Sequence, residues 1–173
     1  MTRADAIAHA CAQFDNGAFF ATLSRRVAYR SESQGGSDAT LAPYLTEEMM
    51  PALAQLGFTA RLVPNPVPGA PSFLVAHRHE SDTAPTVLMY GHGDVVRGYD
   101  EQWRAGLSPW RLQVEGERWY GRGTADNKGQ HSINLAALAS VLAVRGGRLG
   151  FNAKILLEMG EEDIVTHKLV DQE

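Results

Sequence analysis

The N-terminal third of the chain has hydrophobic residues at helical spacing, with polar residues between them. This pattern predicts helix over residues 4–29, with a break at residues 15–17 where an Asp-Asn-Gly stretch can end one helix and start another. A second helix is predicted over residues 37–56, directly before a glycine that can stop it. Pro43 and Pro51 lie inside this second pattern and argue against one unbroken helix.

After residue 57 the pattern changes to short apolar or alternating runs, which are typical of strands. Strands are predicted at residues 58–63, 73–79, 86–90 and 151–158, with a hairpin over residues 113–120. The continuous apolar run 86–90 predicts a strand buried on both faces. A helix is predicted over residues 128–145, between two apolar strands. Together these elements predict an α/β fold with a layered mixed sheet flanked by helices.

Composition and charge narrow the function classes. The chain has 173 residues, which suits one domain, and 20 acidic against 16 basic residues give a formal net charge of −4. This balance excludes a generally basic nucleic-acid binder. The single cysteine, Cys11, excludes an internal disulfide and a metal site made of thiolates. No apolar run is long enough to span a membrane, so we expect a cytoplasmic protein without nucleic-acid or membrane partners.

Polar residues of possible catalytic use follow the predicted strands in three clusters, at residues 91–94, 121–129 and 160–162. Such positions lie at the crevice of open α/β sheets. His92 and Asp94 are two residues apart, so in extended chain their side chains lie on one side, as for a metal-binding histidine oriented by a carboxylate. Each cluster by itself is also typical of an ordinary turn, a helix cap or solvated surface charge. The glycines of the second cluster do not have the spacing of a phosphate-binding loop.

In this order, the three clusters resemble the start of the catalytic domain of one enzyme family. The matching segments read YGHGDVV (residues 90–96), WYGRGTADNKG (119–129) and LEMGEE (157–162). They are similar to the zinc aminoacylase/carnosinase family, which includes acetylornithine deacetylase, succinyl-diaminopimelate desuccinylase and glutamate carboxypeptidase. The resemblance implies a co-catalytic zinc exopeptidase fold that hydrolyses amide bonds in short peptides or N-acyl amino acids.

The resemblance also implies a role for each matching residue. His92 and Glu162 would bind one zinc ion each, Asp126 would bridge the two ions, and cobalt or manganese could replace zinc. Asp94 would orient His92, and Glu161 would be the general base. A cis peptide is expected between Asp126 and the next residue. Arg122, Lys128 and His131 would support the loop and crevice wall, and the other histidines, His9, His77, His79 and His167, match no ligand of the family.

The resemblance stops at residue 162, which suggests a truncated catalytic domain followed by a divergent tail over residues 163–173. The resemblance implies two further metal ligands and a lid domain, through which the family commonly forms homodimers, and we expect this chain to lack them. The strand that ends near Met159 is then expected to have an unpaired edge and an uncovered apolar surface.

Two functions therefore remain open at the level of the sequence. The first is a metal-dependent amide hydrolase with a two-zinc centre. The second is a catalytically inactive fragment that acts at most as a binding or association module. The truncation favours the second function for the isolated chain.

Overall fold

The structure is a computed structural model, and it describes residues 2–162. The helices are α1 (Arg3–Asp15), α2 (Ala18–Ala28), α3 (Asp38–Pro43), α4 (Met50–Gln55) and α5 (Lys128–Val144). A π-helical turn (Tyr44–Met49) joins α3 to α4, and a short 3-10 helix spans Asp100–Gln102. The strands are β1 (Thr59–Val63), β2 (Phe73–Arg78), β3 (Thr86–His92), β4 (Gln113–Glu115), β5 (Arg118–Tyr120) and β6 (Asn152–Glu158).

The main sheet has four strands in the order β1-β2-β6-β3. β1 and β2 are antiparallel, β2 and β6 are antiparallel, and β3 is parallel to β6. The sequence pattern of two apolar strands with a helix between them predicts a crossover connection, and β3, α5 and β6 form it. The predicted mixed sheet is confirmed. His92 at the end of β3 pairs with Glu158 at the end of β6. The carboxyl ends of these two strands therefore meet at one edge of the sheet.

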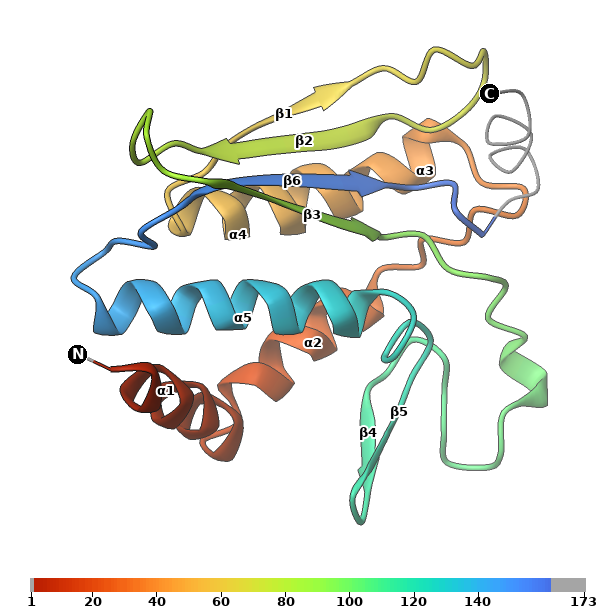
Figure 1. The fold of residues 1–173 in the computed structure, drawn as a ribbon. Coiled ribbons are helices and arrows are strands. Elements are labelled where there is room, and N and C mark those ends of the chain that lie inside the picture. Colours follow the sequence, from red (N-terminus) through yellow and green to blue (C-terminus); the bar gives the residue numbers. More distant parts are fainter. Residues whose placement is uncertain (1, 163–173) are drawn as a thin grey trace.

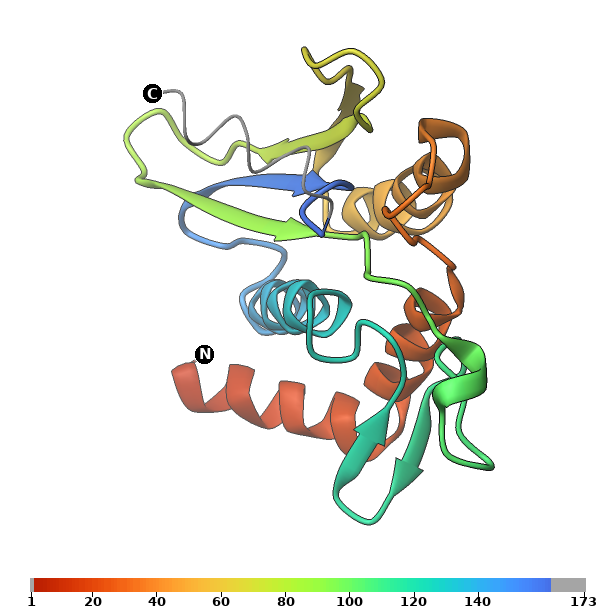
Figure 2. The same cartoon turned by 90° about the vertical axis from the view of Figure 1, so that its right-hand side faces the viewer.

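The helices form two layers on one face of the sheet (Figures 1 and 2). The α3–α4 segment and α5 lie directly against the sheet, and α1 and α2 lie beyond α5. The main core fills the space between the sheet and the first helical layer, with Leu45 and Leu53 from the helical side and Leu74 and Leu157 from the sheet. The β4–β5 hairpin projects away from the sheet and packs through Trp119 against α1 and α2.

The predicted helices occur where the sequence indicates them. α1 and α2 are separated at Gly17, whose φ of +83° is the left-handed conformation that glycine adopts most easily. The α3–α4 segment is helical throughout. Its π-helical turn ends at Met49, two residues before Pro51. Since proline has no N–H for a helical hydrogen bond, a local change of helix type beside it has a clear physical cause.

The prediction that residues 86–90 form a strand buried on both faces is wrong. Within residues 2–162, β3 is an edge strand that pairs only with β6. Leu88 is 68% exposed and Tyr90 is 52% exposed on the face without helices. The strand that ends near Met159, β6, is instead the internal strand, so the predicted unpaired edge belongs to β3. An apolar run reports the hydrophobicity of a strand, but not its position in the sheet.

No helix among residues 2–162 combines the length and the apolar character that a membrane span requires. The expected tail over residues 163–173 lies outside the described residues.

Candidate metal centre

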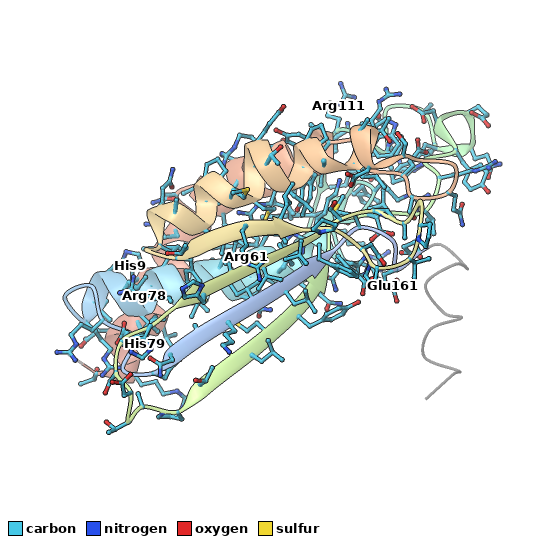
Figure 3. All side chains as sticks on the ribbon, turned by 90° about the horizontal axis from the view of Figure 1, so that it is seen from above. His9, Arg61, Arg78, His79, Arg111 and Glu161 are labelled. Atoms are coloured by element: carbon cyan, nitrogen blue, oxygen red, sulfur yellow. The ribbon has the colours of Figure 1, made fainter. Side chains whose placement is uncertain are left out.

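The five predicted site residues come from three segments that meet at the carboxyl ends of β3 and β6. His92 ends β3, and Asp94 follows in the next loop. Glu161 and Glu162 follow β6, and Figure 3 shows Glu161 just beyond the end of that strand. Asp126 lies in the loop that leads into α5. Segments up to 70 residues apart in the chain therefore contribute to one site.

His92 is at the centre of this group and is almost fully buried. Its Nε2 atom lies 3.1 Å from Asp126 Oδ1 and 3.7 Å from Glu161 Oε2. Its other ring nitrogen, Nδ1, lies 3.3 Å from Asp94 Oδ1 and 3.2 Å from the Asp94 carbonyl oxygen. Asp94 thus orients the ring through its contacts with Nδ1, while Nε2 faces the carboxylates of Asp126 and Glu161. A metal-binding histidine needs this arrangement, because the held nitrogen fixes the tautomer.

Asp94 makes a second contact that the sequence did not indicate. Its side chain is fully buried, and its Oδ2 atom accepts a hydrogen bond of 2.9 Å from the main-chain N–H of Glu162. One carboxylate therefore orients His92 after β3 and also fixes the turn after β6 that carries both glutamates.

The concentration of negative charge perturbs the titration of the site. Burial by itself lowers the pKa of His92, but the neighbouring Asp94, Glu161 and Asp126 carboxylates outweigh burial and raise this pKa to about 9. Burial also raises the pKa of Glu162, and the adjacent Glu161 charge raises it further. Four carboxylates around one imidazole leave an excess of negative charge even when His92 is protonated.

The donor atoms fit a divalent cation. One ligand atom each from His92, Glu161 and Glu162 lies within 4.8 Å of the others. Asp126, whose side chain is 68% exposed, is in contact with His92 but is not part of this triplet. Imidazole nitrogen and carboxylate oxygen are the donors that zinc accepts, along with thiolate. The division of the five residues between ligands and a general base stays a prediction.

The loop before α5 contains the expected cis peptide, between Asp126 and Asn127. Asp126 does not cap α5, because the N-cap position belongs to Asn127. Asn127 is a site residue that sequence reasoning missed. Its Oδ1 atom accepts a hydrogen bond of 3.3 Å from the main-chain N–H of His92 and lies 3.4 Å from His131 Nδ1. An asparagine directly after a predicted metal ligand was the only signal of this role.

Buried polar side chains support the site from the helical side. The Lys128 ammonium donates to the Tyr29 carbonyl oxygen at 2.6 Å, and His131 Nε2 lies 2.5 Å from the Tyr44 hydroxyl. Burial lowers the pKa of Lys128 to about 7. Gly93 is required beside them, because a Cβ atom at this position would clash with the Tyr44 ring. Tyr44 occupies an ordinary core position of a helical pattern, so the sequence contained no signal of this contact.

The remaining predicted residues lie elsewhere. Arg122 donates a long hydrogen bond to the Gly98 carbonyl oxygen, in the loop before the hairpin. His9 contacts Ser140 on α5, and His79 contacts Asp82. Exposed His77 lies on β2. His167 lies outside the described residues.

Comparison with known proteins identifies a family to which the chain is similar. The model of peptidase family M20/M25/M40 matches residues 88–170, an interval that contains all five predicted site residues. The chain is 35% identical to a succinyl-diaminopimelate desuccinylase of Rhodopseudomonas palustris over 119 residues, which cover 68% of this chain and 30% of that protein. It is 41% identical to a cysteinylglycine-S-conjugate dipeptidase of Corynebacterium striatum over 80 residues, 46% of this chain and 17% of that protein.

Solved structures give the same result at the level of the fold. Human carnosine dipeptidase 1 superimposes with a TM-score of 0.78 and 26% identity over 98% of this chain. An M20 family metallo-carboxypeptidase of Sulfolobus solfataricus superimposes with a TM-score of 0.67 and 29% identity over 83% of this chain. The chain covers 37% and 31% of these two proteins, so it spans about a third of their length. The chain therefore belongs to peptidase family M20/M25/M40 and matches part of its catalytic domain.

Proposed function

We propose that this chain carries part of the active centre of a metal-dependent hydrolase that cleaves amide bonds in short peptides or N-acyl amino acids. The observation that carries the proposal is the gathering of His92 and four carboxylates where β3, β6 and the start of α5 meet. Membership of a metallopeptidase family supports the same reaction.

The residues present fit zinc ions, and the resemblance to the family suggests two, with cobalt or manganese as substitutes. His92 and Glu162 would hold one ion each, and Asp126 would contact both. A bound divalent ion supplies Lewis-acid chemistry, which makes water more acidic and polarises the carbonyl group that is attacked. Asp94 keeps His92 Nδ1 occupied, so that Nε2 stays available for the metal.

The proton transfers are assigned to Glu161. Its side chain is partly exposed at the end of β6, where a substrate can reach it. The Glu161 carboxylate accepts a proton from the attacking water, and it returns this proton to the amide nitrogen as the C–N bond breaks. The products are a carboxylic acid and a free amine.

The substrate class rests on the relatives, which are named as a desuccinylase and as dipeptidases. Because the chain spans only 17% to 37% of these proteins, the activity of a whole enzyme is itself part of the proposal. A second candidate function, an association module without catalysis, is favoured by the exposed apolar edge strand β3.

Zinc titration of the full 173-residue chain tests the proposal. Calorimetry should detect zinc binding that His92→Ala abolishes and that His77→Ala leaves unchanged, because His77 is an exposed residue of β2. Hydrolysis of N-succinyl amino acids and of dipeptides is then measured with and without zinc. Zinc-dependent hydrolysis supports the hydrolase. Absent zinc binding, or binding that His92→Ala does not weaken, would overturn the proposed centre.

A further inference from the structure

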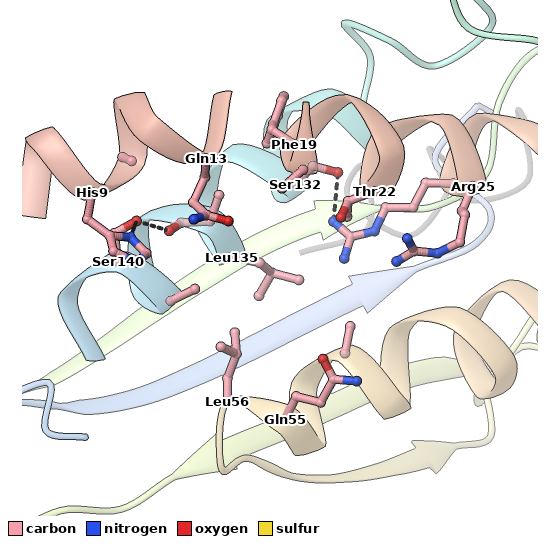
Figure 4. A pocket seen from close by; sticks show the side chains of 16 residues that line it. His9, Gln13, Phe19, Thr22, Arg25, Gln55, Leu56, Ser132, Leu135 and Ser140 are labelled. Carbon is pink, nitrogen blue, oxygen red and sulfur yellow. Dashed lines mark hydrogen bonds between the residues drawn. The ribbon is translucent and has the colours of Figure 1, made fainter. Parts of the chain in front are cut away.

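A cavity of about 220 Å³ lies among the helices α1, α2, α4 and α5 (Figure 4). None of the five residues of the candidate metal centre lines it. α1 and α2 form one wall, α5 forms the floor, and the end of α4 forms the opposite wall. The cavity is therefore a feature of the helical layers and not an extension of the metal centre.

The middle of the cavity is apolar. Leu135 rises from α5 and faces Leu56 at the end of α4. Ala136 and Ala139 on α5 also line the cavity, and their small side chains leave the space between the helices open. A hydrocarbon chain bound in this space would bury its own apolar surface together with that of the cavity walls, which favours binding.

One end of the cavity is cationic, with Arg25 and Arg26 side by side on α2. Arg26 is buried, and its guanidinium donates to Glu48 Oε1 at 3.1 Å and to Ser132 Oγ at 2.7 Å. Arg25 is 59% exposed, and its Nε atom lies 3.4 Å from the other oxygen of Glu48. Two guanidinium groups thus share a single carboxylate, which leaves one excess positive charge.

Among residues 2–162, no carboxylate lines the cavity, although the whole chain is acidic. The hydrogen bond from Arg25 to Glu48 uses Nε, and the two terminal nitrogens of Arg25 have no partner within residues 2–162. These nitrogens form the fork that binds a planar carboxylate through two hydrogen bonds. The opposite end carries His9 and Ser140, which are joined at 3.1 Å (Figure 4).

We propose that this cavity binds a small amphipathic carboxylate, with the oxyanion at Arg25 and Arg26 and an aliphatic chain over Leu135. The volume equals that of about seven waters of the bulk liquid, which suits a ligand of roughly seven to ten non-hydrogen atoms. Six-carbon hexanoate has this size and carries the single negative charge that matches the excess at the arginines.

Calorimetric titration of the full chain with hexanoate tests the site. We expect saturable binding in the millimolar range, with equal affinity in the presence and absence of zinc, because the metal centre is separate. Acetate lacks the chain, hexanamide lacks the charge, and inorganic phosphate is an oxyanion without a chain. Each of these three probes should bind at least ten-fold more weakly. No saturable hexanoate binding, or equal binding of any of the three probes, would overturn the proposal.

Variants locate the binding within the molecule. Ala139→Leu fills the cavity and should weaken hexanoate binding at least ten-fold, whereas Ala137→Leu adds the same group on an exposed position of α5 and should not. Arg25→Gln should weaken binding about five-fold, and it leaves the buried Arg26–Glu48 pair intact. Undiminished binding to the Ala139→Leu protein would place hexanoate elsewhere and contradict the assignment.

Discussion

Asp94 connects the two strand ends that form the candidate metal centre. It has no exposed surface, and it contacts the His92 ring and the Glu162 main chain at once. A buried carboxylate with two partners restricts both, so the orientation of the imidazole and the position of the glutamate turn depend on each other.

Replacing Asp94 by asparagine should lower the pKa of His92 from about 9, because a negative charge that stabilises the imidazolium is removed. NMR titration of the histidine ring in metal-free protein measures this shift. Zinc affinity should also fall about 10- to 100-fold, which is the usual effect of removing a group that orients a metal-binding histidine. Asp82→Asn, beside the exposed His79, is the matched control and should leave both quantities unchanged. An unaltered His92 titration in the Asp94 variant would contradict the assigned contact.

Glu161→Gln should separate metal binding from proton transfer. Glutamine keeps the shape of the side chain but cannot accept the proton of water, so turnover should fall about 10²- to 10⁴-fold. Zinc affinity should change far less, since His92, Asp126 and Glu162 remain. Steady-state kinetics on the substrate identified by the hydrolysis assay, together with a zinc titration, measure the two effects. Glu117→Gln in the exposed hairpin turn serves as control, and near-normal turnover in the Glu161 variant would rule out its role as base.

At the scale of elements, the Glu80 side chain links the segment after β2 to the segment before β6 through hydrogen bonds. Its carboxylate accepts hydrogen bonds from the main-chain N–H groups of Leu149 at 2.6 Å and Gly150 at 2.8 Å, and it also pairs with Arg78. Burial opposes the charge, but these bonds outweigh burial and lower the pKa of Glu80. These Glu80 contacts lie at the opposite end of β6 from the metal centre. They stabilise the start of the internal strand of the sheet.

Glu80→Gln should destabilise the fold at neutral pH by about 1–3 kcal/mol, because a glutamine amide cannot accept from both N–H groups. The lowered pKa means that the carboxylate stabilises the folded state above about pH 4.5, and that this contribution is lost as the pH falls through the folded-state pKa. Urea unfolding at pH 7 and at pH 3 should therefore show a large difference from the wild type at pH 7 and a smaller one at pH 3. An equal difference at both values would show that the charge of Glu80 does not matter.

At the scale of the whole molecule, the described sheet has helices on one face and an open face on the other. The open face ends at β3, where Leu88 and Tyr90 are exposed beside Lys154 and Leu156 of β6. β3 also has unpaired main-chain groups along its outer edge within residues 2–162. An apolar edge strand of this kind is a template for pairing with another chain.

The chain should consequently self-associate at high concentration, and Leu88→Lys should reduce the association by placing a charge on the edge. Ile133→Lys is the matched control, because Ile133 is also an exposed apolar residue but lies on α5. Sedimentation velocity over a range of concentrations measures the effect. Association that Leu88→Lys leaves intact, or that Ile133→Lys abolishes, would place the contact elsewhere.

The sequence by itself determined the elements and the residues that gather at the site. Hydrophobic periodicity is a local property, so helices such as α1 and α5 and the β4–β5 hairpin occur where the pattern predicts them. The clusters around His92, Asp126 and Glu161 were also visible, because catalytic groups of α/β proteins follow the ends of strands.

Tertiary structure alone decided the contacts between distant segments. The order of the strands made β3 the edge and β6 the internal strand, although both are apolar runs. The second bond of Asp94, the bond from His92 to Asn127 and the arginine-lined cavity each join residues from different elements. Such pairings depend on how the elements pack in three dimensions, and a pattern that repeats over a few residues contains no information about that packing.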